Sequence, residues 1–225
     1  MIEVRELNKK YDVDGQSLKA VDNVSLTIES GENVSIIGHS GSGKTTLLSL
    51  IGGLTRPDAG SVLIDNVNIW SMNDDRMSEF RNKKISFIYQ FSSLIPTLTA
   101  LENILLPTAF GDYAEDIEGY AKELLNIVGL ADKVNSYPSH LSGGQQRRVA
   151  VARAFINSPE IVLADEPTGD LDEESEKEVI ELFRRMNEER KITFVIVTHN
   201  KEVAAKATRQ LMMKHGILSD ISAIP

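Results

Sequence analysis

One short stretch of the sequence decides the fold: Gly38-His39-Ser40-Gly41-Ser42-Gly43-Lys44-Thr45. It has the pattern G-x-x-x-x-G-K-[ST], in which glycines allow backbone N–H groups to turn inward around phosphate oxygens. Lys44 would reach the terminal phosphates of a nucleotide, and the Thr45 hydroxyl can ligate Mg²⁺. The stretch predicts a phosphate-binding loop whose nucleotide contacts are Gly38, His39 (through its backbone alone), Ser40, Gly41, Ser42, Gly43, Lys44, Thr45 and Thr46.

The residues on either side of this loop predict a strand before it and a helix after it. VSIIG at 34–38 is a continuous apolar run typical of a buried strand. TTLLSLIGG at 45–53 has apolar residues that suit a core-facing helix, and it ends on two glycines. Strand, loop and helix are the order that phosphate binding requires, because the N-terminus of the helix then faces the anion.

The rest of the chain contains further strand and helix patterns. Alternating apolar segments at 2–7, 24–28 and 61–69 predict strands, and the region from about 97 to 157 reads as helical. Apolar runs at 161–165 and 193–198 predict buried strands, with an amphipathic helix from about 173 to 188 between them. Buried strands that alternate with helices indicate an α/β fold with a parallel sheet, whose sites lie at the carboxyl ends of the strands.

Composition excludes several classes of protein. The chain has 225 residues, no cysteine, and 24 Lys and Arg residues against 33 Asp and Glu residues, a formal net charge of −9. Disulfides, thiolate metal sites and cysteine nucleophiles are excluded, and the acidic balance argues against nucleic-acid binding as the main activity. No apolar run approaches the ~18 residues that a spanning helix needs, which predicts a soluble chain.

Two adjacent carboxylates, Asp165 and Glu166, stand at the end of the apolar run at 161–165. A buried acid is costly unless a cation or a hydrogen-bond donor lies near it. With a phosphate loop in the same chain, Asp165 is predicted to hold Mg²⁺ through water and Glu166 to orient or deprotonate the attacking water. The alternative is that both acids only begin a helix.

A second glycine-containing stretch, Leu141-Ser142-Gly143-Gly144-Gln145, opens a helix that runs through Arg153. Its serine hydroxyl and glycine N–H groups can form another anion-binding helix start. The alternative is an ordinary helix N-cap at Ser142. The sequence thus offers two helix starts that could bind phosphate.

Together these motifs resemble the ATP-binding cassette ATPases. The resemblance covers essentially the whole chain and rests on the order and spacing of the phosphate loop, Gln90 after an apolar strand, LSGGQ at 141–145, Asp165-Glu166, Gly169-Asp170-Leu171-Asp172 and Thr198-His199. More narrowly, ADEPTG at 164–169 and LIPTLTALEN at 94–103 resemble the branch for lipoprotein release, macrolide export and antimicrobial-peptide export.

The resemblance implies the architecture of a P-loop NTPase of the α/β class. It would have a mainly parallel sheet core, an N-terminal antiparallel β subdomain and an inserted helical subdomain. Residues 1–225 would form a single cassette domain. Approximately 1–90 and 158–225 would make the ATP-binding core with the antiparallel part, and approximately 91–157 the helical signature subdomain.

The resemblance also implies roles for individual residues. The implied catalytic residues are Lys44, Gln90, Glu166 and His199, and the implied metal ligands are Thr45, Gln90 and Asp165. Gln90 would contact Mg²⁺ and the attacking water, and His199 would hold the γ-phosphate. Tyr11, 27 residues before the loop, would stack on adenine, since a ring stacks on any base. The alternative for Tyr11 is a plain surface tyrosine.

A second copy of the chain is implied as a partner. The residues that would complete its nucleotide site are Ser142, Gly143, Gly144 and Gln145. The two copies would form an ATP-dependent head-to-tail homodimer with two ATP molecules between them. Asp172 would lie at the interface, and it can also N-cap the acidic helix that follows.

The implied function is ATP binding and hydrolysis in a transporter complex, with ATP and Mg²⁺ as cofactors. Separate membrane-spanning permease subunits would carry out export or release of a lipophilic or peptide-like substrate, with the chain peripheral on the cytoplasmic face of the cell membrane. The segment from Gln90 to about Leu106 would dock the permease, with Phe91, Leu94 and Ile95 as an exposed apolar patch. Phe91 stands where close relatives often have a second glutamine.

Other kinds of cassette protein make different predictions. A DNA-repair or chromosome-organising cassette carries a long insertion between the two glycine motifs, whereas Ser142 follows Lys44 by only 98 residues. Such a clamp also needs a basic surface, so no nucleic acid is expected as a partner. Translation-factor cassettes carry two copies in one chain. A scaffolding ATP sensor has the same motifs, and only ATPase activity distinguishes it.

Overall fold

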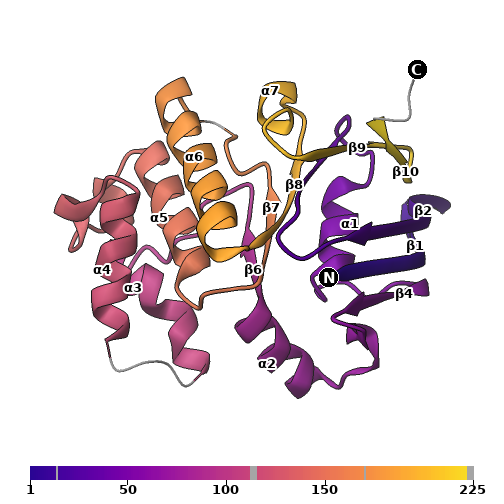
Figure 1. The fold of residues 1–225 in the computed structure, drawn as a ribbon, viewed down its shortest axis with the longest axis horizontal. Helices are drawn as coiled ribbons and strands as arrows, with labels where there is room; N and C mark the ends of the chain where they lie inside the picture. The colour runs from indigo at the N-terminus through magenta and orange to yellow at the C-terminus, as the bar shows by residue number, and fades with distance from the viewer. Residues whose placement is uncertain (14, 112–115, 170, 222–225) are drawn as a thin grey trace.

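Six strands form a central sheet in the order β10-β9-β3-β8-β7-β6 in the computed structural model, which describes residues 1–13, 15–111, 116–169 and 171–221 (Figure 1). From β9 to β6 all neighbours are parallel, and β10 pairs antiparallel with β9 at the edge. The strands are β3 (Asn33–Ile37), β6 (Ile85–Ile88), β7 (Ile161–Asp165), β8 (Thr193–Thr198), β9 (Arg209–Lys214) and β10 (Ile217–Asp220). The expected parallel sheet is confirmed.

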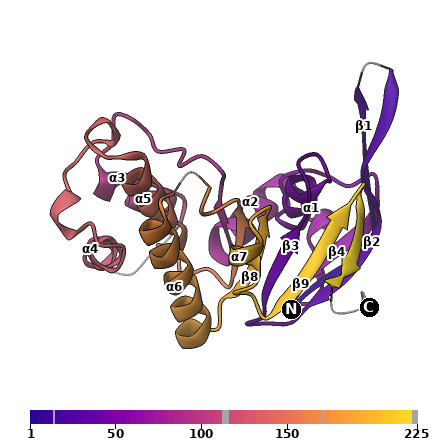
Figure 2. The same cartoon turned by 90° about the horizontal axis from the view of Figure 1, so that it is seen from above.

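The N-terminal part of the chain forms a second, antiparallel sheet in the order β2-β1-β4-β5. Its strands are β1 (Ile2–Val13), β2 (Gln16–Ile28), β4 (Ala59–Ile64) and β5 (Val67–Asn68). β1 and β2 form a long hairpin that extends beyond the rest of the molecule (Figure 2). In β2, Val24, Leu26 and Ile28 are buried while the residues between them are exposed, as expected for a sheet covered on one face.

The α-helices cover both faces of the central sheet, with the largest group of them at the left of Figure 1. They are α1 (Lys44–Ile51), α2 (Asp74–Lys84), α3 (Ala100–Leu105), α4 (Ile117–Ile127), α5 (Gly143–Phe155), α6 (Glu173–Arg190) and α7 (Lys201–Ala204), with 3₁₀ turns η1 (Ile69–Ser71), η2 (Leu106–Phe110), η3 (Ala131–Lys133) and η4 (Pro138–His140). The α/β class with antiparallel and helical parts is confirmed. The subdomain boundaries near residues 90 and 158 stay predictions.

Each face of the central sheet is covered by its own hydrophobic cluster. On β8, Val195 and Val197 belong to a cluster with α1 and the antiparallel sheet, whereas Phe194 and Ile196 belong to one with α5 and α6. Successive side chains of a strand point to opposite faces, so a strand covered on both sides must be apolar throughout. Because β3, β8, β7 and β6 are parallel, the loops that follow them lie at one edge of the sheet, where binding sites form.

The expectation of one strand at 61–69 is wrong. β4 ends at Ile64, and a two-residue turn at Asp65 and Asn66 leads into β5. Both turn residues have positive φ, 50° and 65°. Asp and Asn tolerate this conformation, and two consecutive residues with positive φ give the hairpin turn that matches the twist of the paired strands.

Asn103, on α3, fixes the segment that leads into that helix. Its side chain is fully buried, and its Oδ1 accepts a hydrogen bond of 2.7 Å from the Ile95 backbone N–H. Its Nδ2 donates to the backbone carbonyls of Ile95, Leu98 and Thr99 at 3.1, 2.9 and 2.9 Å. One buried amide therefore holds residues 95–99 against the helical cluster.

Replacing Asn103 with Ala should lower the free energy of unfolding by about 2–3 kcal/mol, because the Ile95 N–H and three partly buried carbonyls lose a hydrogen-bond partner. Urea denaturation followed by circular dichroism measures this change. The control is Lys122→Ala, which removes only an exposed ion pair with Glu118 on α4 and should cost no more than about 0.5 kcal/mol. Equal effects of the two variants would show that Asn103 does not fix this segment.

Candidate functional site

A cavity of about 640 Å³ lies at the carboxyl edge of the central sheet. The residues that line it are Tyr11, Leu18, Ala20, His39, Ser40, Gly41, Ser42, Gly43, Lys44, Thr45, Thr46, Gln90, Asp165, Glu166 and His199. The structure thus brings together the phosphate loop, the residue after β6, the two acids at the end of β7 and the histidine after β8. Leu18 and Ala20, on β2, are the lining residues that sequence reasoning missed.

The glycines of the phosphate loop are required for two different reasons. A Cβ on Gly38 would collide with the carbonyl oxygen of Met213 on β9, and one on Gly43 would collide with the carbonyl oxygen of Ala20 on β2. Gly41 has open space around it but a φ of +75°, a conformation that side chains other than glycine rarely adopt. Packing therefore selects glycine at 38, backbone conformation selects it at 41, and both select it at 43, where φ is +105°.

Polar groups inside the loop are arranged to receive an anion. Lys44 is buried, and its ammonium group donates to the carbonyls of Gly38 and His39 at 2.8 and 3.1 Å. The buried Oγ of Ser42 has no hydrogen-bond partner within the described part of the chain. A buried hydroxyl without a partner is costly, and phosphate oxygens would satisfy it. The loop therefore fits a bound phosphate.

Asp165 is an acid in a position that favours a cation. Burial raises the pKa of this carboxyl, a hydrogen bond with Thr45 opposes the rise, and the negative charge of Glu166 adds to it. Lys44 and Arg147 lower the pKa of Asp165 less strongly. A divalent cation beside Asp165 and Thr45 would favour the ionised acid, and oxygen ligands of this kind suit Mg²⁺.

Glu166 and His199 are in direct contact. One oxygen of Glu166 lies 2.8 Å from Nδ1 of His199 and accepts a hydrogen bond of 2.9 Å from the His199 backbone N–H. The other oxygen accepts from the Thr198 hydroxyl at 2.9 Å. The Glu166 side chain is 13% exposed and that of His199 is 74% exposed. The acid is thus held at the base of the cavity with the imidazole at its mouth.

The comparisons with known proteins agree with this geometry. Residues 21–169 match the ABC transporter family. A curated relative from Thermotoga maritima, described as an uncharacterized ABC transporter ATP-binding protein, is 45% identical over 98% of the chain and 94% of its own length. The chain belongs to the ABC transporter family.

Two further relatives and one solved structure show how the cassette is used elsewhere. The lipoprotein-releasing system ATP-binding protein LolD of Porphyromonas gingivalis is 43% identical over 97% of the chain and 98% of its own length. The macrolide export ATP-binding/permease protein MacB of Rhodopirellula baltica is 42% identical over 98% of the chain but only 33% of its own length. A dimeric ATP-binding cassette in a post-hydrolysis state, bound to ADP and Pi, superposes with a TM-score of 0.91 at 40% identity and covers 100% of both chains.

The signature stretch of the cassette lies outside the cavity of its own chain. Ser142 is the N-cap of α5: its hydroxyl accepts a hydrogen bond from the Gln145 N–H at 3.2 Å, and the Gln145 side chain accepts one from the Ser142 N–H at 2.9 Å. Ser142 and Gly143 are exposed. Gly144 lies near Ser175 and Asp172 at the start of α6. The N-cap interpretation is confirmed, and no residue of this stretch lines the cavity described above.

The structure places Tyr11 at the cavity and Asp172 at the start of α6, and the adenine contact of Tyr11 and the interface role of Asp172 stay predictions. Tyr11 is 39% exposed and lines the cavity. The ammonium group of Lys9 lies 5.6 Å from the centre of the Tyr11 ring. Asp172 caps α6, with its carboxylate accepting from the backbone N–H and the hydroxyl of Ser175 at 2.9 Å each. Asp170, quoted with Asp172 in the family motif, lies outside the described residues.

The expected docking patch is only partly exposed. Phe91 is 73% exposed and Ile95 is 37% exposed. Leu94 is partly buried and packs against the helical cluster, because residues 95–99 are held down by Asn103. The patch therefore consists of Phe91 and Ile95 without Leu94. In the part of the chain that the structure describes, no helix has the length and apolar character needed to cross a membrane.

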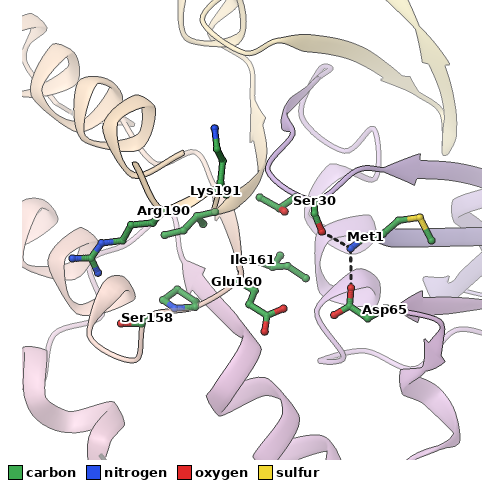
Figure 3. A pocket seen from close by; sticks show the side chains of 11 residues that line it. Met1, Ser30, Asp65, Ser158, Glu160, Ile161, Arg190 and Lys191 are labelled. Atoms are coloured by element: carbon green, nitrogen blue, oxygen red, sulfur yellow. Dashed lines mark hydrogen bonds and ion pairs between the residues drawn. The ribbon is translucent and has the colours of Figure 1, made fainter. Parts of the chain in front are cut away.

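A smaller cavity of about 290 Å³ lies at the opposite edge of the sheet, at the start of β7 and β8 (Figure 3). Met1 forms an ion pair of 2.9 Å with Asp65 on one side of it. The side chains of Arg190 and Lys191 extend away from that pair. Because its cationic groups do not converge, this cavity does not offer a phosphate site.

Asp165→Asn should raise the melting temperature of the nucleotide-free cassette at pH 7.5. Burial raises the pKa of Asp165 above its usual 3.8, so the folded chain holds that proton more tightly and the ionised acid destabilises the fold. The gain should shrink as the pH falls toward 4, where the wild-type acid becomes protonated. Differential scanning fluorimetry across this range measures it. A variant that is less stable than wild type at pH 7.5, or a gain that grows in acid, would contradict the assignment.

Proposed function

We propose that the chain is the ATP-binding and ATP-hydrolysing subunit of an ABC transporter complex, acting through separate membrane-spanning permease subunits. The observation that carries this proposal is the single cavity that holds the phosphate loop together with Gln90, Asp165, Glu166 and His199. ATP is the nucleotide named for the curated relatives, and the superposed cassette holds its hydrolysis products. Family membership, cavity and residues point to the same reaction.

Within the cavity, the phosphates of ATP would lie in the loop and the adenine against Tyr11. Loop N–H groups and Lys44 would neutralise the charge on the phosphates, and Ser42 would gain the partner that it lacks in the described residues. The ammonium group of Lys44, now bonded to loop carbonyls, would turn to the terminal phosphates. Leu18 and Ala20, which also line the cavity, would offer the adenine an apolar contact surface.

Mg²⁺ would be held by Thr45, Gln90 and Asp165, which all line the cavity. When bound, Mg²⁺ stabilises the charge that develops on the β and γ phosphate oxygens. Deprotonated Asp165 and the Thr45 hydroxyl would supply oxygen ligands, and Gln90, which follows β6 and lines the same cavity, would add its amide oxygen. These ligands come from three separate segments, so metal binding would also fix those segments relative to one another.

Glu166 and His199 would act on the attacking water and the γ-phosphate. Glu166 accepts hydrogen bonds from Thr198 and His199, which orient its carboxylate toward the cavity. From there it can hold the water and take its proton. His199, exposed at the mouth, would donate to the γ-phosphate. Lys44 would stabilise the charge that develops as the bond to the leaving ADP breaks.

The complete site would need two subunits. The α5 N-terminus with Ser142, Gly143, Gly144 and Gln145 is exposed or half-buried and lies away from its own cavity. A head-to-tail homodimer would place this helix start against the γ-phosphate bound by the partner. The superposed cassette is itself described as dimeric. ATP would therefore hold the two subunits together, and hydrolysis would release them.

Permease docking would place the cassette at the cytoplasmic face of the membrane as a peripheral subunit. Phe91, which has an exposed apolar side chain, directly follows Gln90, and the exposed Ile95 lies a few residues further along, so a permease bound there would sense the nucleotide through Gln90. The names of the LolD and MacB relatives support export or release of a lipophilic or peptide-like substrate. Substrate contacts would lie on the permease.

Glu166→Gln should retain ATP binding and lower the rate of hydrolysis by about 100-fold or more, because the amide cannot take a proton from water. Phosphate release measures hydrolysis, and a fluorescent ATP analogue measures binding. The variant should also accumulate as an ATP-bound dimer in gel filtration. Glu118→Gln, an exposed acid on α4, is the matched control. Full hydrolysis by Glu166→Gln would refute the general-base role, and absent hydrolysis in the wild type would favour a scaffolding ATP sensor.

Phe91→Glu should weaken binding to the permease by at least about tenfold, since a charge would enter an apolar contact. Co-purification with a co-expressed permease that binds the wild-type chain measures the loss. Ile217→Glu is the matched control: Ile217 is 57% exposed, but it lies on β10. Unchanged co-purification of Phe91→Glu would remove the docking proposal while leaving the ATPase proposal intact.

A further inference from the structure

Arg147, in the first turns of α5, is a buried cation between two loops of the nucleotide cavity. Its side chain is only 3% exposed. Nε donates to the carbonyl of Pro167 at 2.8 Å, and a terminal nitrogen donates to the carbonyl of Glu166. The other terminal nitrogen donates to the carbonyls of Tyr89 and Gln90. One guanidinium therefore joins the segment after β6 to the segment after β7.

This contact needs the geometry of arginine. The guanidinium is planar and carries five N–H donors in a fixed fork, so it can bond carbonyls on two sides at once. A lysine ammonium is a single point of charge on a flexible stem. Arg153, further along α5, extends the contact by donating to the carbonyls of Ser92 and Ser93 at 3.1 and 3.0 Å.

The Glu166 backbone is in a conformation that depends on its neighbours. Its φ is +46°, in the left-handed region that non-glycine residues adopt only when the surroundings hold them there. Its N–H donates to the carbonyl of Val197 at 2.9 Å, and its own carbonyl is bound by Arg147. The peptide on one side of Glu166 is thus fixed by β8 and that on the other side by α5.

We propose that Arg147 is a positioning residue for ATP hydrolysis, which fixes the backbones of Glu166 and Gln90 relative to each other. The inference rests on the proposed function, in which both side chains act on the attacking water. Loss of the guanidinium would free both segments. The two side chains would then meet the water at variable separation, and a misplacement of about 1 Å can cost about 100-fold in rate. The phosphate loop, which dominates nucleotide affinity, would be unaffected.

The test compares wild type with Arg147→Met and Arg147→Lys as full chains. We expect Arg147→Met to lower kcat for ATP by about 30- to 100-fold, while the Kd for a fluorescent ATP analogue changes by less than about threefold. Arg147→Lys should recover only part of the loss, because it keeps the charge without the fork. Hydrogen exchange should quicken at the amides of residues 89–91 and 166–169 in Arg147→Met.

A core truncation on the same helix controls for a general loss of packing. Val149 is fully buried on α5, so Val149→Ala should lower the melting temperature while keeping kcat and the slow exchange of both segments. If Val149→Ala loses as much kcat as Arg147→Met at a similar melting temperature, Arg147 is merely structural and the proposal is wrong. A parallel loss of kcat and nucleotide affinity in Arg147→Met would also overturn it.

The hydrogen-exchange measurement tests the role of Arg147 independently of the proposed ATPase function. If the wild type hydrolyses no ATP but Arg147→Met loosens both segments, the bridging role stands and the ATPase function fails. If the wild type is active and neither segment loosens in Arg147→Met, Arg147 does not fix them and the proposal fails while the ATPase function stands.

Discussion

The phosphate loop lies so close to two other strands that its sequence and the arrangement of the sheets depend on each other. Gly38 leaves no room for a Cβ beside the carbonyl oxygen of Met213 on β9, and Gly43 leaves none beside that of Ala20 on β2. A side chain at either position would push the loop away from a strand. The loop is thus fixed at the point where the parallel sheet and the antiparallel sheet approach each other, and the rest of the nucleotide cavity is built outward from it.

Around this fixed loop, the parallel order of the strands gathers chemical groups that are distant in sequence. β8 lies between β3 and β7, and β6 follows β7 at the edge. Because all four strands run in the same direction, their carboxyl ends deliver Lys44, Gln90, Glu166 and His199 to one cavity. The apolar clusters on both faces keep the sheet rigid, so these groups are held at defined separations.

The burial of charge at this edge is balanced by partners rather than avoided. Asp165 is disfavoured as an ionised acid in the free chain, whereas Arg147 is buried among backbone carbonyls. Thr45, Lys44 and Arg147 offset only part of the effect of burial on Asp165, so a site with this acid beside a phosphate loop is suited to bind a metal with its nucleotide. A site that uses an arginine to bind carbonyls of two loops gains rigidity in both loops.

Sequence patterns predicted most elements because caps and apolar spacing act locally. Gly52 caps the C-terminus of α1, and Ser142 and Asp172 cap the N-termini of α5 and α6, all as their residue types indicate. The pattern missed α2, whose sequence DDRMSEFRNKK has Met77 as its buried residue, and it missed the β9–β10 hairpin. The same pattern predicted one strand where the structure has β4 and β5. The two turn residues between them do not interrupt the alternation of apolar and polar residues.

The sequence by itself determined the family and predicted most residues of the cavity, among them a glycine-rich loop and two adjacent acids. The reason is that these motifs consist of particular side chains at fixed local spacing. Only the tertiary structure decided that Glu166 contacts His199, that Ser142 lies away from its own cavity, and that Arg147 joins two loops. Those contacts link segments far apart in the chain, and their distances are set by strand order and helix packing, which no local pattern contains.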